Sequence, residues 1–132
     1  MKSNWLRKLV FCIFFAVLPI TESLAAAGKF NFVVGDVRVL SASGERKAEK
    51  GGEVVASETI VSGKDGMAQL RISDGAFIAV RADTELRIDQ YNYNGKPDAS
   101  SNSVLSLVKG TFRAFTGAIA SFNKDNFKMK TP

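Results

Sequence analysis

Residues 62–80 read SGKDGMAQLRISDGAFIAV, and this run decides the fold. Ala68, Leu70 and Ile72 alternate with the polar residues Gln69 and Arg71. A period of two places one row of side chains on a core and the other row in water, as in a half-buried β-strand. The Asp-Gly pairs that flank the alternating segment are typical of tight turns. The run therefore predicts two short strands, at 68–72 and 77–80, separated by a turn.

The same pattern of short apolar strands and polar turns extends in both directions. Residues 30–40 and 54–61 are rich in β-formers, and further strands are expected at 86–88 and within 104–117. No segment after residue 28 shows a sustained apolar period of 3.6 residues with helix caps. Short strands at near-regular spacing indicate an all-β domain. Solenoid-like and sandwich-like arrangements give the same alternation, so both remain open for residues 28–132.

Residues 91–103 interrupt the strands and read YNYNGKPDASSNS. Gly, Pro, Asn, Asp and Ser favour turns, so the segment is expected to form a long polar loop. Loops on rigid scaffolds often carry binding residues, which makes Tyr91 and Tyr93 candidate partner-contact residues. Alternatively, the two tyrosines extend the preceding strand, because aromatic residues favour strands.

The first 27 residues have the organisation of a secretory signal peptide, preceding the β-domain as an N-terminal signal helix. A short cationic head at residues 2–8 is followed by an uncharged apolar run at residues 9–20 and then by small residues. A membrane-spanning helix needs about 20 apolar residues, so this run is too short for a permanent anchor.

The small residues at the end of this segment predict where it is cleaved. Ala25 and Ala27 fit the two small positions of the cleavage site, so Gly28 is the expected new N-terminus. Cleavage after Ala25 or after Ala26 is the alternative.

Processing changes the charge and the cysteine content of the chain. Cys12, the only cysteine, lies in the apolar run, so the processed chain has none and forms no internal disulfide. The 18 basic and 13 acidic side chains become 15 and 12, a net charge of +3. This charge is spread along the chain, whereas nucleic-acid-binding proteins have clustered basic stripes. In residues 124–130, Lys128 and Lys130 alternate with apolar residues, which indicates a solvated strand face more than an anion-binding patch.

The residue types that carry most enzymatic chemistry are missing. The chain has no histidine, and the processed chain has no cysteine, so the usual general base, thiolate nucleophile and zinc ligands are absent. Asp65, Asp74 and Asp83 lie beside turns, and turn formation explains them better than a calcium site, because no dense acidic loop is present. We therefore expect a non-enzymatic protein with no catalytic residue, metal or cofactor.

Several of these segments together resemble a known family. They are GDVRV at 35–39, TIVSGKDGMAQL at 59–70, SDGAFIAV at 73–80, TELRI at 84–88 and LVKGTFRAFTG at 107–117. In order and spacing they resemble FecR-type periplasmic domains over nearly all of residues 30–132.

The resemblance implies a periplasmic domain that binds other proteins. The best-known members relay a surface signal, such as siderophore uptake at an outer-membrane receptor, to a cytoplasmic sigma factor. They do so through an anti-sigma segment and a membrane helix that precede the domain, whereas here a cleavable signal precedes it. The chain thus looks more like the exported FecR-domain proteins. Family members usually continue past a Thr-Pro such as Thr131–Pro132, so a truncated form is expected, with an open sheet edge that permits self-association.

The sequence thus predicts a non-catalytic protein-interaction or sensory module that is periplasmic or secreted and takes part in envelope signalling. Its expected partner is another envelope protein, not a nucleic acid, and it meets the membrane only through the signal peptide before cleavage. The alternative is an envelope structural or glycan-associated domain, which export and the slight positive charge favour.

Overall fold

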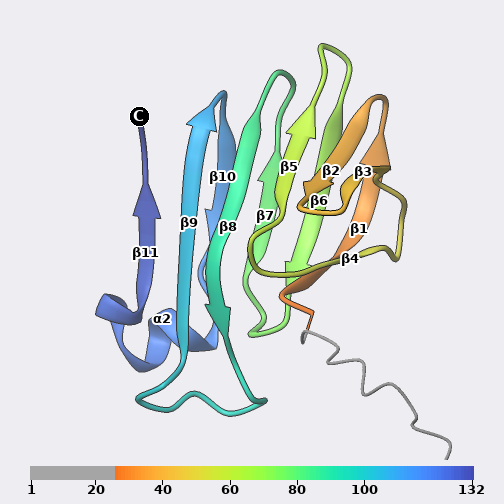
Figure 1. The fold of residues 1–132 in the computed structure, drawn as a ribbon. Helices are drawn as coiled ribbons and strands as arrows, with labels where there is room; N and C mark the ends of the chain where they lie inside the picture. Colours follow the sequence, from red (N-terminus) through yellow and green to blue (C-terminus); the bar gives the residue numbers. More distant parts are fainter. Residues whose placement is uncertain (1–25) are drawn as a thin grey trace, which may run out of the picture.

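The computed structural model describes residues 26–132, so the predicted signal peptide lies outside the described residues except for Ala26 and Ala27. The described chain forms two β-sheets that enclose one hydrophobic core (Figure 1). This confirms the predicted all-β class, and of the two arrangements left open the structure has the sandwich-like one. Within residues 26–132, no helix combines the length and the apolar character that crossing a membrane requires.

Each sheet is assembled from strands that are distant in the sequence. In spatial order, the five-stranded sheet contains β10 (Phe112–Phe115), β7 (Phe77–Val80), β6 (Met67–Ile72), β1 (Gly28–Val34) and β4 (Glu53–Val54). The six-stranded sheet contains β11 (Phe127–Lys130), β9 (Asn102–Lys109), β8 (Glu85–Asn92), β5 (Thr59–Ser62), β2 (Val37–Ser41) and β3 (Gly44–Lys47). Neighbouring strands are antiparallel, except that β11 runs parallel to β9.

The core between the sheets is built from the alternating apolar residues. The predicted strands 68–72 and 77–80 are β6 and β7, which pair antiparallel in the five-stranded sheet. Their inward side chains meet those of β5, β8 and β2 from the other sheet. The largest fully buried side chains are Phe30, Ile60, Leu70, Leu86, Ile88 and Ile119. Burial of a Leu, Ile or Phe side chain contributes roughly 1.5–3 kcal/mol. The buried apolar side chains are therefore the main source of stability in a domain without disulfides.

Two glycine-containing turns, β1–β2 and β5–β6, pack against each other at one end of the sandwich. The N–H of Gly63 donates to the carbonyl oxygen of Asp36 at 2.9 Å, and a Cβ on Gly66 would lie 2.2 Å from that same oxygen. Gly35 has a φ of +68°, and a Cβ there would lie 2.2 Å from the carbonyl oxygen of Asp65. Glycine is therefore required where the β1–β2 turn meets the β5–β6 turn.

The polar loop is shorter than the sequence indicates. Strand β8 continues to Asn92 and β9 begins at Asn102, so the loop comprises residues 93–101 instead of 91–103. The cross-strand pairs Tyr91–Ser103 and Asn92–Asn102 extend the β8–β9 hairpin into the segment that was expected to be loop. The polar composition hid these pairs, because backbone ladder bonds do not depend on side-chain polarity.

Two short helical segments, α2 (Ala118–Phe122) and η2 (Lys124–Asn126), connect β10 to β11. Both segments are too short to show a sustained apolar period of 3.6 residues, and so the sequence did not predict them. Asp74, predicted to be a turn residue, accepts from the N–H of Ala76 at 3.1 Å within its own turn. Its other carboxylate oxygen accepts from the N–H of Ile119 at 3.2 Å, and so the turn also fixes the start of α2.

Candidate binding surface on the five-stranded sheet

The outer face of the five-stranded sheet carries apolar side chains that face solvent. Phe32 and Val34 of β1, Met67 of β6 and Phe115 of β10 are all among the exposed large hydrophobic residues, and Phe77 of β7 is half-exposed beside them. We call these five residues the apolar face. Strands β1, β6, β7 and β10 are consecutive neighbours (Figure 1). A patch of this kind on one sheet marks a binding surface more often than isolated exposed apolar residues do.

A bulge in β1 creates part of this face. The register of β1 against β6 shifts between Phe30 and Phe32. In a regular strand these two residues would point to the same side, since side chains alternate. Because of the extra residue, Phe30 lies in the core with 2% of its surface exposed, whereas Phe32 faces solvent with 44% exposed. The bulge therefore turns a phenylalanine outward.

A shallow groove of about 240 Å³ crosses the apolar face. Phe77 and Phe115, opposite each other on β7 and β10, form a tilted aromatic pair with ring centroids 6.3 Å apart. Their rings, Phe32 and Met67 line the groove together with the Arg81 and Arg113 side chains. The groove thus joins aromatic surface to guanidinium groups.

The charged side chains that line the groove are of one sign. Arg81 and Arg113 line the groove, and Arg71 lies opposite Phe77 in the β6–β7 pair. All three arginines are exposed, and none of them takes part in an ion pair with another residue of the described chain. No carboxylate from the described residues lines the groove. The surface therefore favours a partner that brings both apolar groups and negative charge.

The structure places the two candidate contact tyrosines away from this groove. Tyr91 packs against the hydrophobic core, and its hydroxyl is buried without a hydrogen-bond partner in the part of the chain described. Burial raises the pKa of this hydroxyl well above its usual value, and the negative charge of Asp74 raises it further. Tyr93 lies just beyond the end of β8 and is half-exposed.

The predicted cleavage residues lie within the folded domain. Ala27 belongs to the hydrophobic core cluster, with 1% of its surface exposed. Gly28 is the first residue of β1 and pairs with both Val54 and Ile72.

The sequence predicts the outer face of the five-stranded sheet less clearly than it predicts the core. The alternation around Gln69 and Arg71 predicts a polar outer row on β6, and that row gives no hint of the apolar neighbours on β7 and β10. The sequence signals for this face are the apolar run FIAV at residues 77–80 and the sequence FRAF at residues 112–115. Strand β7 begins with a phenylalanine, and β10 has one at each end. No group of three or more potential metal-ligating side chains occurs within residues 26–132.

Comparison with known proteins gives limited overlap. No protein-family model matches the chain, and no curated protein matches it. A solved structure described as "Cell surface anchoring domain" is similar over 46% of this chain and 82% of that chain, with 27% sequence identity and a TM-score of 0.44. The overlap includes less than half of the chain, so inferences on function rest on the chain's own residues.

Proposed function

We propose that this chain is an exported, non-catalytic binding domain of the cell envelope. In this proposal the outer face of the five-stranded sheet docks an acidic, partly apolar segment of another envelope protein. The observation that carries it is the groove in which Phe77, Phe115 and Phe32 lie beside Arg81 and Arg113.

The composition of the groove supports a protein partner. The cores of protein–protein interfaces are enriched in aromatic residues, Met and Arg, and are depleted in Lys, Asp and Glu. The groove has three phenylalanines, one methionine and two arginines among its lining residues, and no Lys, Asp or Glu. Large rigid rings and guanidinium groups are also the side chains that most often dominate binding energy.

The resemblance to FecR-type periplasmic domains supports the same proposal from the sequence. A domain of that type acts by binding other envelope proteins, which is a role that needs a docking surface and no catalytic chemistry. In this proposal, the chain works in the periplasm or outside the cell, and recognition at the groove is the step that conveys a signal.

The test is crosslinking in cells of the tagged, exported protein, followed by mass spectrometry of what is captured. Phe115→Ser and Arg113→Glu remove one aromatic ring and reverse one charge at the groove. Phe122→Ser and Lys128→Glu are matched controls, because both residues are exposed and lie on other elements. A partner captured by the wild type and both controls, and lost from both groove variants, is the expected result. Equal capture by groove variants and controls would refute docking at this face.

A second candidate is an envelope structural or glycan-associated domain. The observation that favours it is the exclusively positive charge of the groove lining, which also suits carboxylate-bearing glycans, since Arg binds carboxylates in a planar, bidentate manner. Co-sedimentation with purified cell-wall material at low and high salt tests it. Sedimentation at low salt that Arg113→Glu abolishes would favour the glycan role, because screening weakens exposed charge attraction.

A further inference from the structure

We infer that signal peptidase cleaves this chain between Ala25 and Ala26, so that the mature protein begins at Ala26. This inference rests on the proposed export. It differs from cleavage after Ala27, which the Ala-x-Ala spacing of Ala25 and Ala27 suggests on its own.

The first observation is that Ala27 is a structural residue of the β-domain. Its N–H donates to the carbonyl oxygen of Val54 at 2.8 Å, and its own carbonyl oxygen accepts from the N–H of Ser73 at 2.8 Å. It therefore continues β1 by one residue, between β4 and the β6–β7 turn. Its methyl group is buried in the core and lines a small internal cavity beside Asp74 and Tyr91.

Ala26 is also held by the domain. Its carbonyl oxygen accepts from the hydroxyl of Ser73 at 2.7 Å. Unlike Ala27, Ala26 is partly exposed. Ser73 thus binds both alanines, one through its backbone and the other through its side chain.

Cleavage after Ala27 would damage this arrangement. The N–H of Ser73 and the carbonyl oxygen of Val54 would lose their partners in β1, and the core would lose the buried methyl group of Ala27. The new ammonium group would fall on Gly28, the first residue of β1, which pairs with both β4 and β6.

The second observation is that the sequence offers another site that spares both alanines. Signal peptidase requires small residues at the last and third-last positions of the signal peptide. Ser23 and Ala25 meet this requirement for cleavage after Ala25. For cleavage after Ala26, the third-last position is Leu24, which is too large. Only the site after Ala25 both satisfies the peptidase and leaves the sheet complete.

The experiment is intact-mass measurement and N-terminal sequencing of the full-length precursor after export in bacterial cells. A mature chain that begins at Ala26 is the expected result. A chain that begins at Gly28 overturns the inference and leaves the proposed export intact. A chain that keeps residues 1–25 overturns both.

A variant separates the two sites further. Ser23→Leu blocks the site after Ala25 and leaves the Ala25–Ala27 spacing unchanged. We expect the product that begins at Ala26 to disappear and the precursor to accumulate, or a chain that begins at Gly28 to replace it. Wild-type yield of a product that begins at Gly28 in both proteins would contradict the inference.

Discussion

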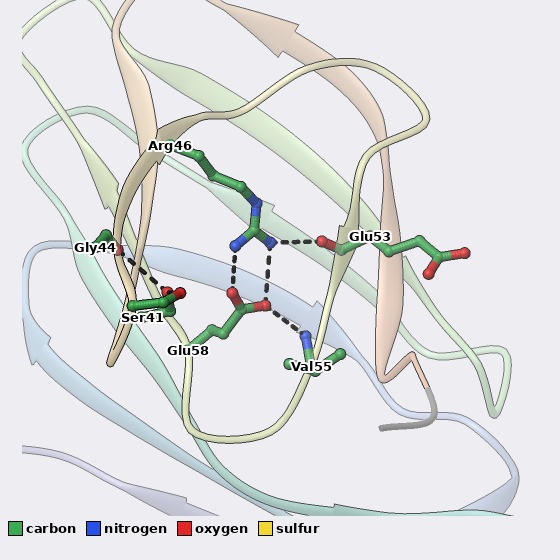
Figure 2. A network of polar contacts seen from close by, with 7 residues as sticks. Ser41, Gly44, Arg46, Glu53, Val55 and Glu58 are labelled. Atoms are coloured by element: carbon green, nitrogen blue, oxygen red, sulfur yellow. Dashed lines mark hydrogen bonds and ion pairs between the residues drawn. The ribbon is translucent and has the colours of Figure 1, made fainter. Parts of the chain in front are cut away.

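The guanidinium group of Arg46 and the carboxylate of Glu58 form a two-point ion pair that ties β3 to the loop before β5 (Figure 2). Glu58 is buried, and its carboxylate also accepts from the N–H of Val55 at 2.8 Å. Arg46 donates in addition to the carbonyl oxygen of Glu53 at 2.7 Å, so the pair joins three segments of the chain. Burial raises the pKa of Glu58, but the hydrogen bonds from Arg46 and Val55 outweigh it and hold the pKa below its usual value.

Glu58→Gln is expected to lower the free energy of unfolding by about 1–2 kcal/mol at pH 7, since a charge-assisted pair is lost while Arg46 stays partly exposed. The matched control is Glu45→Gln, which removes an exposed partner of Arg38 and is expected to cost less than about 0.5 kcal/mol. Urea denaturation of the three proteins measures the difference. An equal effect of both substitutions would contradict the structural role of Glu58.

The effect of Glu58→Gln depends on pH. Because folding lowers the pKa of Glu58, its contribution is fully present above the pKa of the unfolded chain, about 4.3, and is lost as the pH falls through the lower pKa of the folded state. The stability difference between wild type and variant is therefore expected to be constant from pH 7 to about 5 and to shrink toward pH 3. Denaturation curves over this range test the prediction, and a difference that grows on acidification would refute it.

Tyr91→Phe is expected to leave the stability within about 0.5 kcal/mol of the wild type or to raise it, because the Tyr91 hydroxyl is buried and has no hydrogen-bond partner within residues 26–132. Tyr91→Ala is expected to cost about 2 kcal/mol or more, since the ring packs against the core. Thermal unfolding of both variants measures these effects. A strongly destabilised Tyr91→Phe protein would show that the hydroxyl has a partner.

Thr84→Val is expected to destabilise the domain by about 1–3 kcal/mol. The side chain of Thr84 is fully buried, and its hydroxyl accepts from the N–H of Thr111 at 3.0 Å. Valine has nearly the same shape but leaves that N–H without its acceptor. Thr116→Val at an exposed position is the control. Chemical denaturation compares the two, and equal stabilities would contradict the prediction.

Lys128→Thr combined with Lys130→Thr is expected to increase self-association. Strand β11 is an edge of the six-stranded sheet, and both lysines are exposed on it. Charged side chains, lysine above all, protect such edges from pairing with another chain. Analytical ultracentrifugation over a range of protein concentrations measures the change. Lys124→Thr in η2, outside the edge strand, is the control, and equal association of the two variants would refute a protective role.

Local patterns predicted much of the fold and little of the candidate site. The alternation at Ala68, Leu70 and Ile72 predicted a strand whose inward row is buried, and the structure confirms it. The apolar face did not follow from such patterns, because Phe32 faces outward only through a bulge opposite β6. The inward orientation of Tyr91 likewise depends on its pairing with Ser103 and on the second sheet.

The sequence by itself determined the all-β class, the positions of the main strands and the turns between them. Period-two alternation and glycine conformations act within a few residues, so they can be read along the chain. Only the tertiary structure decided which strands are neighbours, why Ala27 belongs to the core, and how Phe77 and Phe115 come to share a groove with Arg81 and Arg113. These relationships join residues far apart in sequence, and they arise from the packing of two complete sheets on one core.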